Sequence, residues 1–526
     1  MNDRSRDSSL AAFWAPGVPA ARAGVMVGIT TLALYAATAG TLVGSHDPAQ
    51  FQTLARTGGI AHSGYPTVIL LLQLFAQLPF GTLPFKANLL SAVSGAVAVG
   101  LAAYAGTRLT RSARGGVAGA VALALSFTLW EESTHAGVHA FTLALDATIL
   151  LLALRFARAP GAWLAFATGT VCGIALTSHL TCLSLAFPLA AIAILTARRG
   201  LLRVGHGAAI VGGIAVGVLP FLYVFAMDQA TQPMNYLHDS LDPALVSFAV
   251  EHPTADQRLE RFAWLVSGRQ YLAGGGSDAL RSLPRRAVRL ALDLSFNDFP
   301  FGVALLAAFG FALVVLRRDA LALVLAAWAL GVAAFVAVGA APLMLRIFFM
   351  PGSFLLALGL ATTVAVVQRR GIGLAALLAI ALVVAPLSRV FVTAPPTGLP
   401  RSTMITSIWN LIPAEWSPFV NDRSWDEYGR GAMAQLPPNA VVLTCWREAT
   451  VLRYFVFGEP LRPDVEIRYA CGFAPRFQRM AREAQAAGRP VYASYDPGPE
   501  LLGEHGHAER AWSHAHGDLW RVTVGP

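Results

Sequence analysis

The stretch GVMVGITTLALYAATAGTLVGSHDPAQF (24–51) decides the fold, because it joins a membrane-crossing segment to a charged loop. Residues 24–43 carry no charge, and a helix needs about 20 apolar residues to cross the hydrocarbon core of a bilayer. His46 and Asp47 follow directly behind this apolar run. Ionisable residues at the edge of a span are costly and are by default candidates for function. The sequence therefore predicts a helical membrane protein with chemistry at the end of its first span.

Composition extends this prediction to the whole chain. Of 526 residues, 55% are hydrophobic and 13% are charged, whereas soluble domains carry about 25% charged residues. The formal net charge of +9 does not indicate nucleic acid, because the arginines are scattered between apolar runs and form no basic face with aromatic side chains. The lipid bilayer is the predicted partner. Lys86 is the only lysine, a usage typical of high-GC bacteria, so we expect the inner (plasma) membrane.

Arginine placement predicts the topology. Each arginine cluster falls on one side of the membrane if the N-terminus is cytoplasmic, as the positive-inside rule requires. The run 67–81 must then not cross. Its apolar part between Pro66 and Pro79 has only about 13 residues, which is too short for a span, so the run is predicted to lie on the outer surface. Eleven spans follow, with the N-terminus inside and the C-terminus outside: 24–43, 87–107, 115–130, 140–157, 161–178, 180–197, 206–226, 299–316, 320–341, 345–367 and 372–392.

The predicted fold class is an all-α polytopic membrane protein with a small C-terminal α/β domain outside the cytoplasm. In the tail, strand-like AVVLT (440–444) and RPVYASY (489–495) alternate with the helix-like run 476–488. Cys445 and Cys471 lie in this tail and form a disulfide at about even odds. The predicted parts are a cytoplasmic N-terminus (1–23), a transmembrane domain (24–392) with external loops 44–86 and 227–298, and the soluble domain (393–526).

Candidate site residues gather at the predicted outer ends of the spans. A carboxylate there could deprotonate an acceptor hydroxyl, and an arginine could clamp a lipid-linked phosphate. Each has a plainer interpretation as well: a solvated loop tip, an interior histidine, or an arginine that reaches the headgroups. The catalytic candidates are Asp47, His62, Glu131, Glu132 and His135, and the substrate-binding candidates are Tyr65, His139, His179 and Arg346. No cofactor is indicated, and a divalent metal stays open.

Several segments, in order along the chain, resemble the GT-C membrane glycosyltransferases. The resemblance is greatest to the transmembrane O-mannosyltransferase-like family. It is carried by the Asp47 loop, the His62…Gly64-Tyr65-Pro66 turn and seven further pieces of sequence: KANLLSAVSGA (86–96), Trp130, His179-Leu180, FAWLVSGRQY (262–271), LRIFFMP (345–351), LPPNAVVLT (436–444) and LRPDVEIR (461–468). Gln50 stands where the family usually has a second acidic residue, and CWREAT (445–450) where it has an acidic motif.

The resemblance implies a polyprenyl-phosphate sugar donor and transfer, possibly of mannose, to a hydroxyl of a protein or glycan outside the cytoplasm. It implies Asp47 as the catalytic carboxylate, with Arg346 and Arg269 as ligands of the carrier phosphate. Two other functions stay open. A transporter or flippase of lipid-linked intermediates is favoured by Asp146 inside the fourth span, although transporters usually show repeated halves. A non-catalytic relative that binds the carrier is the other.

Overall fold

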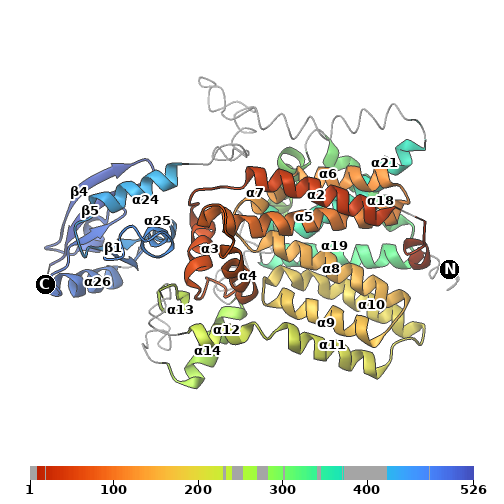
Figure 1. Ribbon diagram of the computed structural model, residues 1–526, viewed down its shortest axis with the longest axis horizontal. Coiled ribbons are helices and arrows are strands. Elements are labelled where there is room, and N and C mark those ends of the chain that lie inside the picture. Colours follow the sequence, from red (N-terminus) through yellow and green to blue (C-terminus); the bar gives the residue numbers. More distant parts are fainter. Residues whose placement is uncertain are drawn as a thin grey trace.

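The computed structural model of the chain describes residues 9–17, 19–228, 233–239, 253–268, 282–299, 302–339, 345–369, 371, 423–472 and 474–525. Arg269, the predicted span 372–392 and the beginning of the tail at 393 lie outside these residues. Within them, a long helical part carries a smaller domain with a β-sheet at one end (Figure 1). The predicted fold class is confirmed.

In the described ranges, seven helices are long and apolar enough to cross a membrane, or nine if each of two bent helix pairs is one span. The predicted span 161–178 forms α9 (Ala162–Leu176), whose 15 residues extend about 22 Å and fall short of a 30 Å hydrocarbon core. The seven are α2 (Ala20–Thr38), α5 (Leu83–Thr110), α8 (His139–Arg158), η1 with α10 (Leu180–Leu185, Ala186–Arg198), α11 with α12 (Val204–Gly217, Phe221–Met227), α19 (Ala320–Gly339) and α21 (Met350–Gln368).

The span predicted over 115–130 is one of the bent pairs. Helices α6 (Ala113–Ala124) and α7 (Phe127–Thr134) meet at 64°. The backbone N–H of Thr128 donates to Oδ1 of Asp298 at 2.8 Å, and the Thr128 hydroxyl donates to Oδ2 at 3.1 Å. Asp298 thereby satisfies an N–H at the beginning of α7, which has no partner within the helix. This cap comes from the other bent pair, α17 and η3 (Leu283–Asp293, Leu294–Asp298) with α18 (Val303–Leu316).

Small residues let the helices approach closely where they carry the candidate site. A Cβ on Gly95 of α5 would lie 2.0 Å from Oγ of Ser133 in α7. A Cβ on Gly24 of α2 would lie 2.9 Å from the carbonyl oxygen of Gly100 in α5. Close packing at small residues is the usual way in which membrane helices associate. It holds α7, with Glu131 and Glu132, directly against α5.

The run predicted not to cross is a short helix, as expected. Helix α4 (Pro66–Ala76) has 11 residues and extends about 16 Å, half the thickness of a hydrocarbon core. Val68, Ile69 and Leu72 are fully buried, whereas Leu74 is 63% exposed. Helix α4 packs against α3 (His46–Thr57) in the first loop, and both lie between the spans and the C-terminal domain (Figure 1).

The C-terminal domain is α/β, as predicted. Its sheet has the order β2-β1-β3-β5-β4, with β1 parallel to β2 and β3, and β5 antiparallel to β3 and β4. Cys445 and Cys471 form a disulfide, which decides the question that their spacing left open. The elements are α24 (Ser424–Gln435), β1 (Val441–Thr444), α25 (Trp446–Arg453), η5 (Tyr454–Gly458), β2 (Glu466–Tyr469), α26 (Ala474–Ala486), β3 (Val491–Ala493), α27 (Gly498–Leu502), β4 (His507–His514) and β5 (Gly517–Thr523).

This domain packs against the first loop. Val43 and Ala49 share a buried apolar cluster with Trp425 and Tyr428 of the domain. Arg56 in α3 donates from Nη1 to the carbonyl oxygen of Gly458 at 3.1 Å. The domain is therefore seated on the loop that carries Asp47.

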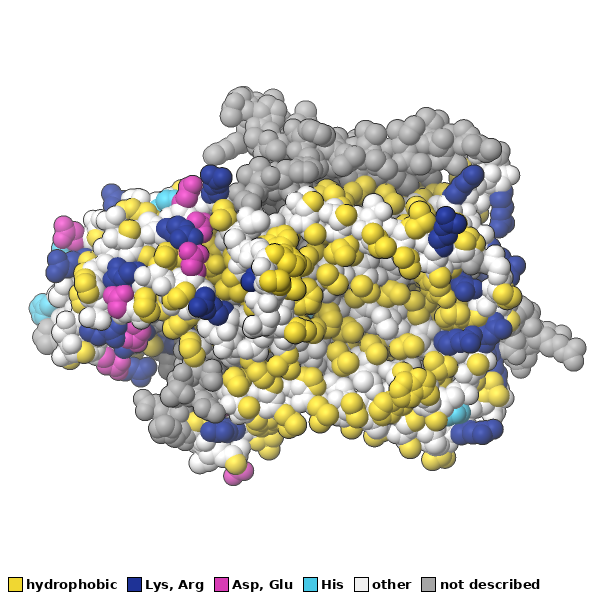
Figure 2. All heavy atoms as spheres, viewed as in Figure 1, with side chains coloured by type: hydrophobic (Ala, Val, Ile, Leu, Met, Phe, Trp, Pro, Cys, Tyr) yellow, Lys and Arg dark blue, Asp and Glu magenta, His cyan; other side chains and the backbone are white. Residues whose placement is uncertain are grey.

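On the face drawn in Figure 2, a group of Lys and Arg side chains lies at the end of the helical part away from the C-terminal domain, and others lie on that domain. A broad band of hydrophobic side chains covers the surface between that end and the C-terminal domain. Arg108, in the last turn of α5, and Arg158, at the end of α8, donate to backbone carbonyls of residues 9–17. This distribution matches the charge asymmetry of the sequence, and which end faces the cytoplasm stays a prediction.

Candidate active site

Asp47 and His62 form the first pair of the site. Asp47 lies in the first turn of α3, where the helix dipole favours a negative charge, and His62 lies in the turn that leads to α4. Oδ2 of Asp47 is 3.5 Å from Nε2 of His62, and their side chains are 36% and 13% exposed. The pair is therefore close to water on the carboxylate side and enclosed on the imidazole side.

Gln50 orients the imidazole. Its Oε1 is 2.8 Å from Nδ1 of His62. An amide oxygen only accepts, so Nδ1 carries a proton and donates it to Gln50. Nε2 then faces the Asp47 carboxyl, and a favourable contact between them requires one proton held by the two groups. The arrangement can take up or release a proton beside Asp47.

Arg346 and Glu131 form the second pair. Nη2 of Arg346, in α20 (Leu345–Phe348), donates to Oε2 of Glu131 at 2.8 Å. The guanidinium lies over the ring of Phe127 at 4.5 Å, and its side chain is 16% exposed. The arginine predicted to clamp a phosphate is therefore held by a carboxylate, which a bound anion would have to join or displace.

A row of rings connects the two pairs. Tyr65 stacks on His179 at 5.7 Å, and His179 stacks on Phe348, again at 5.7 Å. His139 stands edge-on to His179 at 4.7 Å. The hydroxyl of Tyr65 is 3.5 Å from Nε2 of His62, and Phe348 shares α20 with Arg346. The predicted substrate-binding residues Tyr65, His139 and His179 are thus brought together between the two pairs.

Burial keeps His179 neutral. Desolvation lowers the pKa of its imidazole well below the ordinary value, and the nearby His139 and His62 lower it further. Its Nδ1 faces the hydroxyl of Thr181 at 2.9 Å and accepts from the Thr181 backbone N–H at 3.1 Å. At neutral pH this side chain presents a flat, uncharged ring to the site.

The two remaining catalytic candidates, Glu132 and His135, differ in their relation to the site. Glu132 lies close enough to both pairs to be influenced by the charges of Glu131, Arg346 and Asp47. His135 points elsewhere, because its Nδ1 lies 3.1 Å from the carbonyl oxygen of Glu131 at the end of α7. No contact ties the His135 ring to the row of histidines in the described part of the chain. The structure therefore joins Glu132 to the site and does not join His135 to it.

Two residues of the site have a left-handed backbone that is rare outside glycine. His46 has φ of +52° and Tyr65 has φ of +48°. Each costs about 1–3 kcal/mol and persists only where its surroundings impose it. His46 directly precedes Asp47, and Tyr65 directly precedes α4, so a strained residue lies on each side of the first pair in the sequence. Such strain is common at functional sites.

The sequence did not single out Tyr236 and Trp446, which also contact His62. Their ring centroids lie 6.3 Å and 5.8 Å from the imidazole. Tyr236 begins the short helix α13 (Tyr236–Asp239), and Trp446 begins α25. Trp446 lies in CWREAT (445–450), the segment that departs from the acidic motif of the family, and neither residue carried a signal of its own in the sequence.

No group of three or more His, Cys, Asp or Glu suited to a metal ion occurs among the described residues.

Known proteins resemble this chain in two respects: one part of its sequence and its whole fold. Residues 47–203 match the family model described as the protein O-mannosyl-transferase TMEM260 N-terminal domain. Over 151 residues the chain is 32% identical to the protein O-mannosyl-transferase TMEM260 of Mus musculus. The match takes in 28% of this chain, and the chain spans about a fifth (21%) of the mouse protein. The resemblance predicted from the sequence is confirmed.

The fold resembles that of two crystal structures of ArnT from Cupriavidus metallidurans. The apo structure has a TM-score of 0.54 at 15% identity, over 95% of this chain and 98% of that one. The structure bound to undecaprenyl phosphate has a TM-score of 0.55 at 15% identity, over 96% and 98% of the two chains. This chain has the GT-C fold. The segment that matches the O-mannosyl-transferase family begins at Asp47 and includes both Glu131 and His179.

Proposed function

We propose that the chain is a glycosyltransferase that moves a sugar from a polyprenyl-phosphate carrier to a hydroxyl group. The acceptor oxygen attacks the anomeric carbon from the face opposite the phosphate. The bond from that carbon to the phosphate oxygen breaks, and the carrier phosphate leaves with the bonding electron pair. The hydroxyl proton passes to the enzyme. The proposed sugar is mannose, and the proposed acceptor is a protein Ser or Thr or a glycan.

The observation that carries this proposal is the Asp47–His62 pair, at the end of a GT-C fold that lies beside the C-terminal domain. Asp47 is the group that takes the acceptor proton, and His62 shares that proton. A positioned base contributes typically 10²–10⁴ in rate, provided that it lies within hydrogen-bonding reach of the hydroxyl. The 36% exposure of the Asp47 side chain leaves it accessible to an acceptor that arrives from water.

Arg346 is the proposed ligand of the carrier phosphate. Its guanidinium can donate two parallel hydrogen bonds to a phosphate, which a lysine cannot do. Glu131 holds it in place before the donor binds, so we assign Glu131 a positioning role beside its predicted catalytic one. Arg269 remains a second proposed phosphate ligand, and Glu132 is proposed to adjust the charge between the two pairs.

Two known proteins support this assignment by their names. The mouse relative is called a protein O-mannosyl-transferase, and one structure with this fold was solved with undecaprenyl phosphate bound. Both names involve groups for which this site is suited: a hydroxyl acceptor and a lipid phosphate. We place the site on the extracytoplasmic face of the inner (plasma) membrane, because the arginine-rich end would face the cytoplasm.

Transport is the second candidate, and Asp146 favours it. This residue lies within α8 and is fully buried, and neither of its carboxyl oxygens has a hydrogen-bond partner among the described residues. Buried ionisable groups inside membrane helices often mark ion or substrate pathways. Asp47 and His62 lie in the first loop and not within one of the long apolar helices, which is why we prefer transfer.

One assay separates the candidates. The full chain is reconstituted in vesicles with polyprenyl-phosphate mannose, glucose or galactose, and with peptide and glycan acceptors. Transfer predicts that the bare carrier appears together with a glycosylated hydroxyl. Donor that crosses the bilayer without losing its sugar would favour transport. Donor that binds, stays on its side and keeps its sugar would favour a non-catalytic relative.

A further inference from the structure

Three rings from three separate parts of the chain meet at the proposed base. His62 comes from the first loop, Tyr236 from the beginning of α13, and Trp446 from the C-terminal domain. The centroids of Tyr236 and Trp446 are 5.9 Å apart, and their planes are inclined at 87°. The His62 plane is inclined at 74° to Tyr236 and at 79° to Trp446. The three planes are thus nearly perpendicular to one another, and we call this group the ring corner.

The backbone holds Tyr236 in this position. The N–H of Ile60 donates to the carbonyl oxygen of Met234 at 2.8 Å, and the N–H of Tyr236 donates to the carbonyl oxygen of Ile60 at 3.1 Å. A Cβ on Gly59 would lie 2.0 Å from that Met234 oxygen, and Gly59 has φ of +114°. Only glycine permits this approach. The two loops are therefore tied together two residues before His62.

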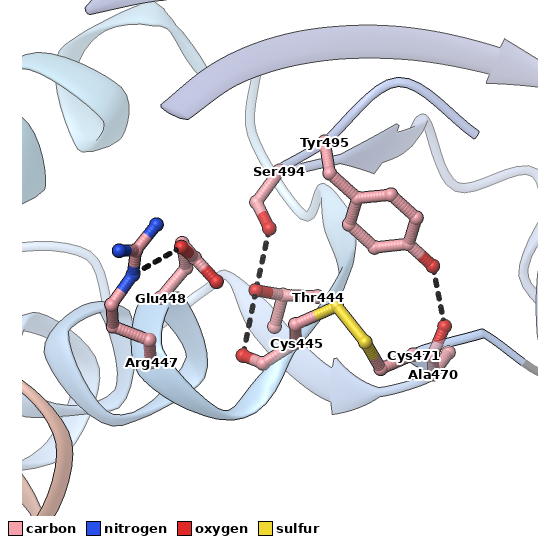
Figure 3. Close-up of a disulfide and its surroundings, with 8 residues drawn as sticks. All are labelled: Thr444, Cys445, Arg447, Glu448, Ala470, Cys471, Ser494 and Tyr495. Atoms are coloured by element: carbon pink, nitrogen blue, oxygen red, sulfur yellow. Dashed lines mark hydrogen bonds and ion pairs between the residues drawn. A yellow bond between two sulfur atoms is a disulfide. The ribbon is translucent and has the colours of Figure 1, made fainter. Parts of the chain in front are cut away.

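The disulfide holds Trp446. Cys445 is the residue between β1 and α25, and its bond to Cys471 joins the carboxyl ends of β1 and β2 (Figure 3). The hydroxyls of Thr444 and Ser494 lie 2.6 Å apart and join β1 to the end of β3. Trp446 follows directly and is half-buried. The disulfide and the Thr444–Ser494 hydrogen bond therefore fix the carboxyl ends of three strands. Trp446 contacts His62 from this end of the sheet.

We infer that the ring corner is a subsite for a pyranose ring beside Asp47. A pyranose has apolar C–H faces and a rim of hydroxyls. Tyr and Trp suit it because they combine a large apolar face with a polar group at the edge. His62 brings the same subsite to Asp47 at 3.5 Å, next to the bond that changes in the proposed reaction. The inference rests on the proposed function and makes Trp446 a specificity-determining residue.

Two sources could supply the ring: the sugar of the donor, or a sugar already present on the acceptor. The full-length protein is purified in lipid nanodiscs, and the Kd is measured for undecaprenyl phosphate alone and for undecaprenyl-phosphate mannose, glucose and galactose. A second titration adds the methyl glycosides of the same sugars to protein saturated with undecaprenyl phosphate. Four proteins are compared: wild type, Trp446→Leu, Trp446→Phe and Trp520→Leu. Trp520 is a matched control, because it lies in β5 of the same domain and packs in a different apolar cluster.

For wild type we expect one hexose to improve binding over the bare carrier. Trp446→Leu should raise the Kd for that glycosylated ligand about tenfold. The Kd for the bare carrier should not change. Trp446→Phe should keep most of the improvement, and Trp520→Leu should keep all of it. A loss confined to the methyl glycosides assigns the subsite to the acceptor sugar. A wild type that binds bare and glycosylated ligands equally, or a Trp446→Leu variant that keeps the full improvement in both titrations, overturns the inference. If no lipid phosphate binds, the proposed function itself fails.

Discussion

The arginines at the two ends of the helical part have partly different partners. At the end away from the C-terminal domain, Arg108 donates to the carbonyl oxygen of Ala15 at 2.6 Å and Arg158 to that of Ala11 at 2.8 Å. The guanidinium of Arg108 also lies 5.8 Å from the ring of Trp14. At the end beside the C-terminal domain, Arg346 donates to the carboxylate of Glu131 at 2.8 Å.

This comparison indicates at which end a lipid phosphate can bind beside a group that accepts a proton. Carbonyl oxygens are neutral acceptors, so Arg108 and Arg158 keep their positive charge, which would suit a surface beside anionic headgroups. Arg317, at the same end, is instead paired with Asp319 at 2.8 Å, and among the described residues neither has an imidazole partner like that of Asp47. A carboxylate compensates the charge and can be exchanged for a phosphate, because both accept from a guanidinium fork. The second end also has a carboxylate–imidazole pair, Asp47 with His62. We therefore expect catalysis to depend on one end and folding on both.

The largest effect should come from Asp47→Asn. The amide cannot accept the acceptor proton, so we expect the transfer rate to fall about 10²–10⁴-fold at unchanged thermal stability. Asp319→Asn at the opposite end is the control. Asp319 caps α19 by accepting from the N–H of Ala322 at 2.8 Å, a role that Asn can also fill. It also pairs with Arg317 at 2.8 Å, so this variant removes a carboxylate from an arginine at the opposite end and is a matched control for charge loss. Equal losses in the two variants would remove the distinction between the ends.

Next in size is the loss of the disulfide. Replacing Cys445 and Cys471 by serine opens a loop with a sequence separation of 26, and should lower the free energy of unfolding of the C-terminal domain by about 3 kcal/mol. Denaturant unfolding, followed by a probe within the domain, measures this. Cys172, a free cysteine in α9, provides the control. If Cys172→Ser destabilised the domain as much, the staple would not be the cause.

Arg346→Ala should weaken binding of the lipid phosphate about 10–100-fold, the value of one or two charge-assisted hydrogen bonds. Arg346→Lys should recover only part of the loss, because a lysine lacks the bidentate fork. The measurement is the Kd for undecaprenyl phosphate in nanodiscs. Full affinity in the alanine variant would show that the phosphate binds elsewhere.

The smallest effect should come from Arg108→Ala. It removes one hydrogen bond to Ala15 and the contacts with the Trp14 and Tyr104 rings, which together stabilise by about 1–2 kcal/mol. Thermal unfolding should shift down while the transfer rate per folded molecule stays unchanged. A drop in that rate would mean that the arginine-rich end takes part in catalysis.

Much of this arrangement follows from local sequence. Apolar runs of about 20 residues predict spans, and Asp47 was identifiable because it follows the first of these runs directly. The bend between α6 and α7 was not identifiable. The apolar run continues across it, and the capping Asp298 lies 170 residues along the chain from Thr128. Local patterns contain no such contact.

The same reason explains the disulfide and the ring corner. Spacing alone left the Cys445–Cys471 bridge undecided, whereas the parallel register that pairs Thr444 with Tyr469 brings the two strand ends together. Trp446 reaches His62 only because the C-terminal domain packs on α3. Gln50 looked like a missing acid in the sequence, and in the structure it orients His62 instead.

The central claim is that transfer occurs at the end beside the C-terminal domain. Sealed vesicles are prepared with the full chain, and its orientation is scored by protease access to the C-terminal domain. A short-chain, water-soluble polyprenyl-phosphate sugar and an impermeant acceptor are then added outside. The account predicts transfer in proportion to the molecules whose C-terminal domain faces outward, and none after Asp47→Asn. Transfer in proportion to the molecules with the arginine-rich end outward would contradict it.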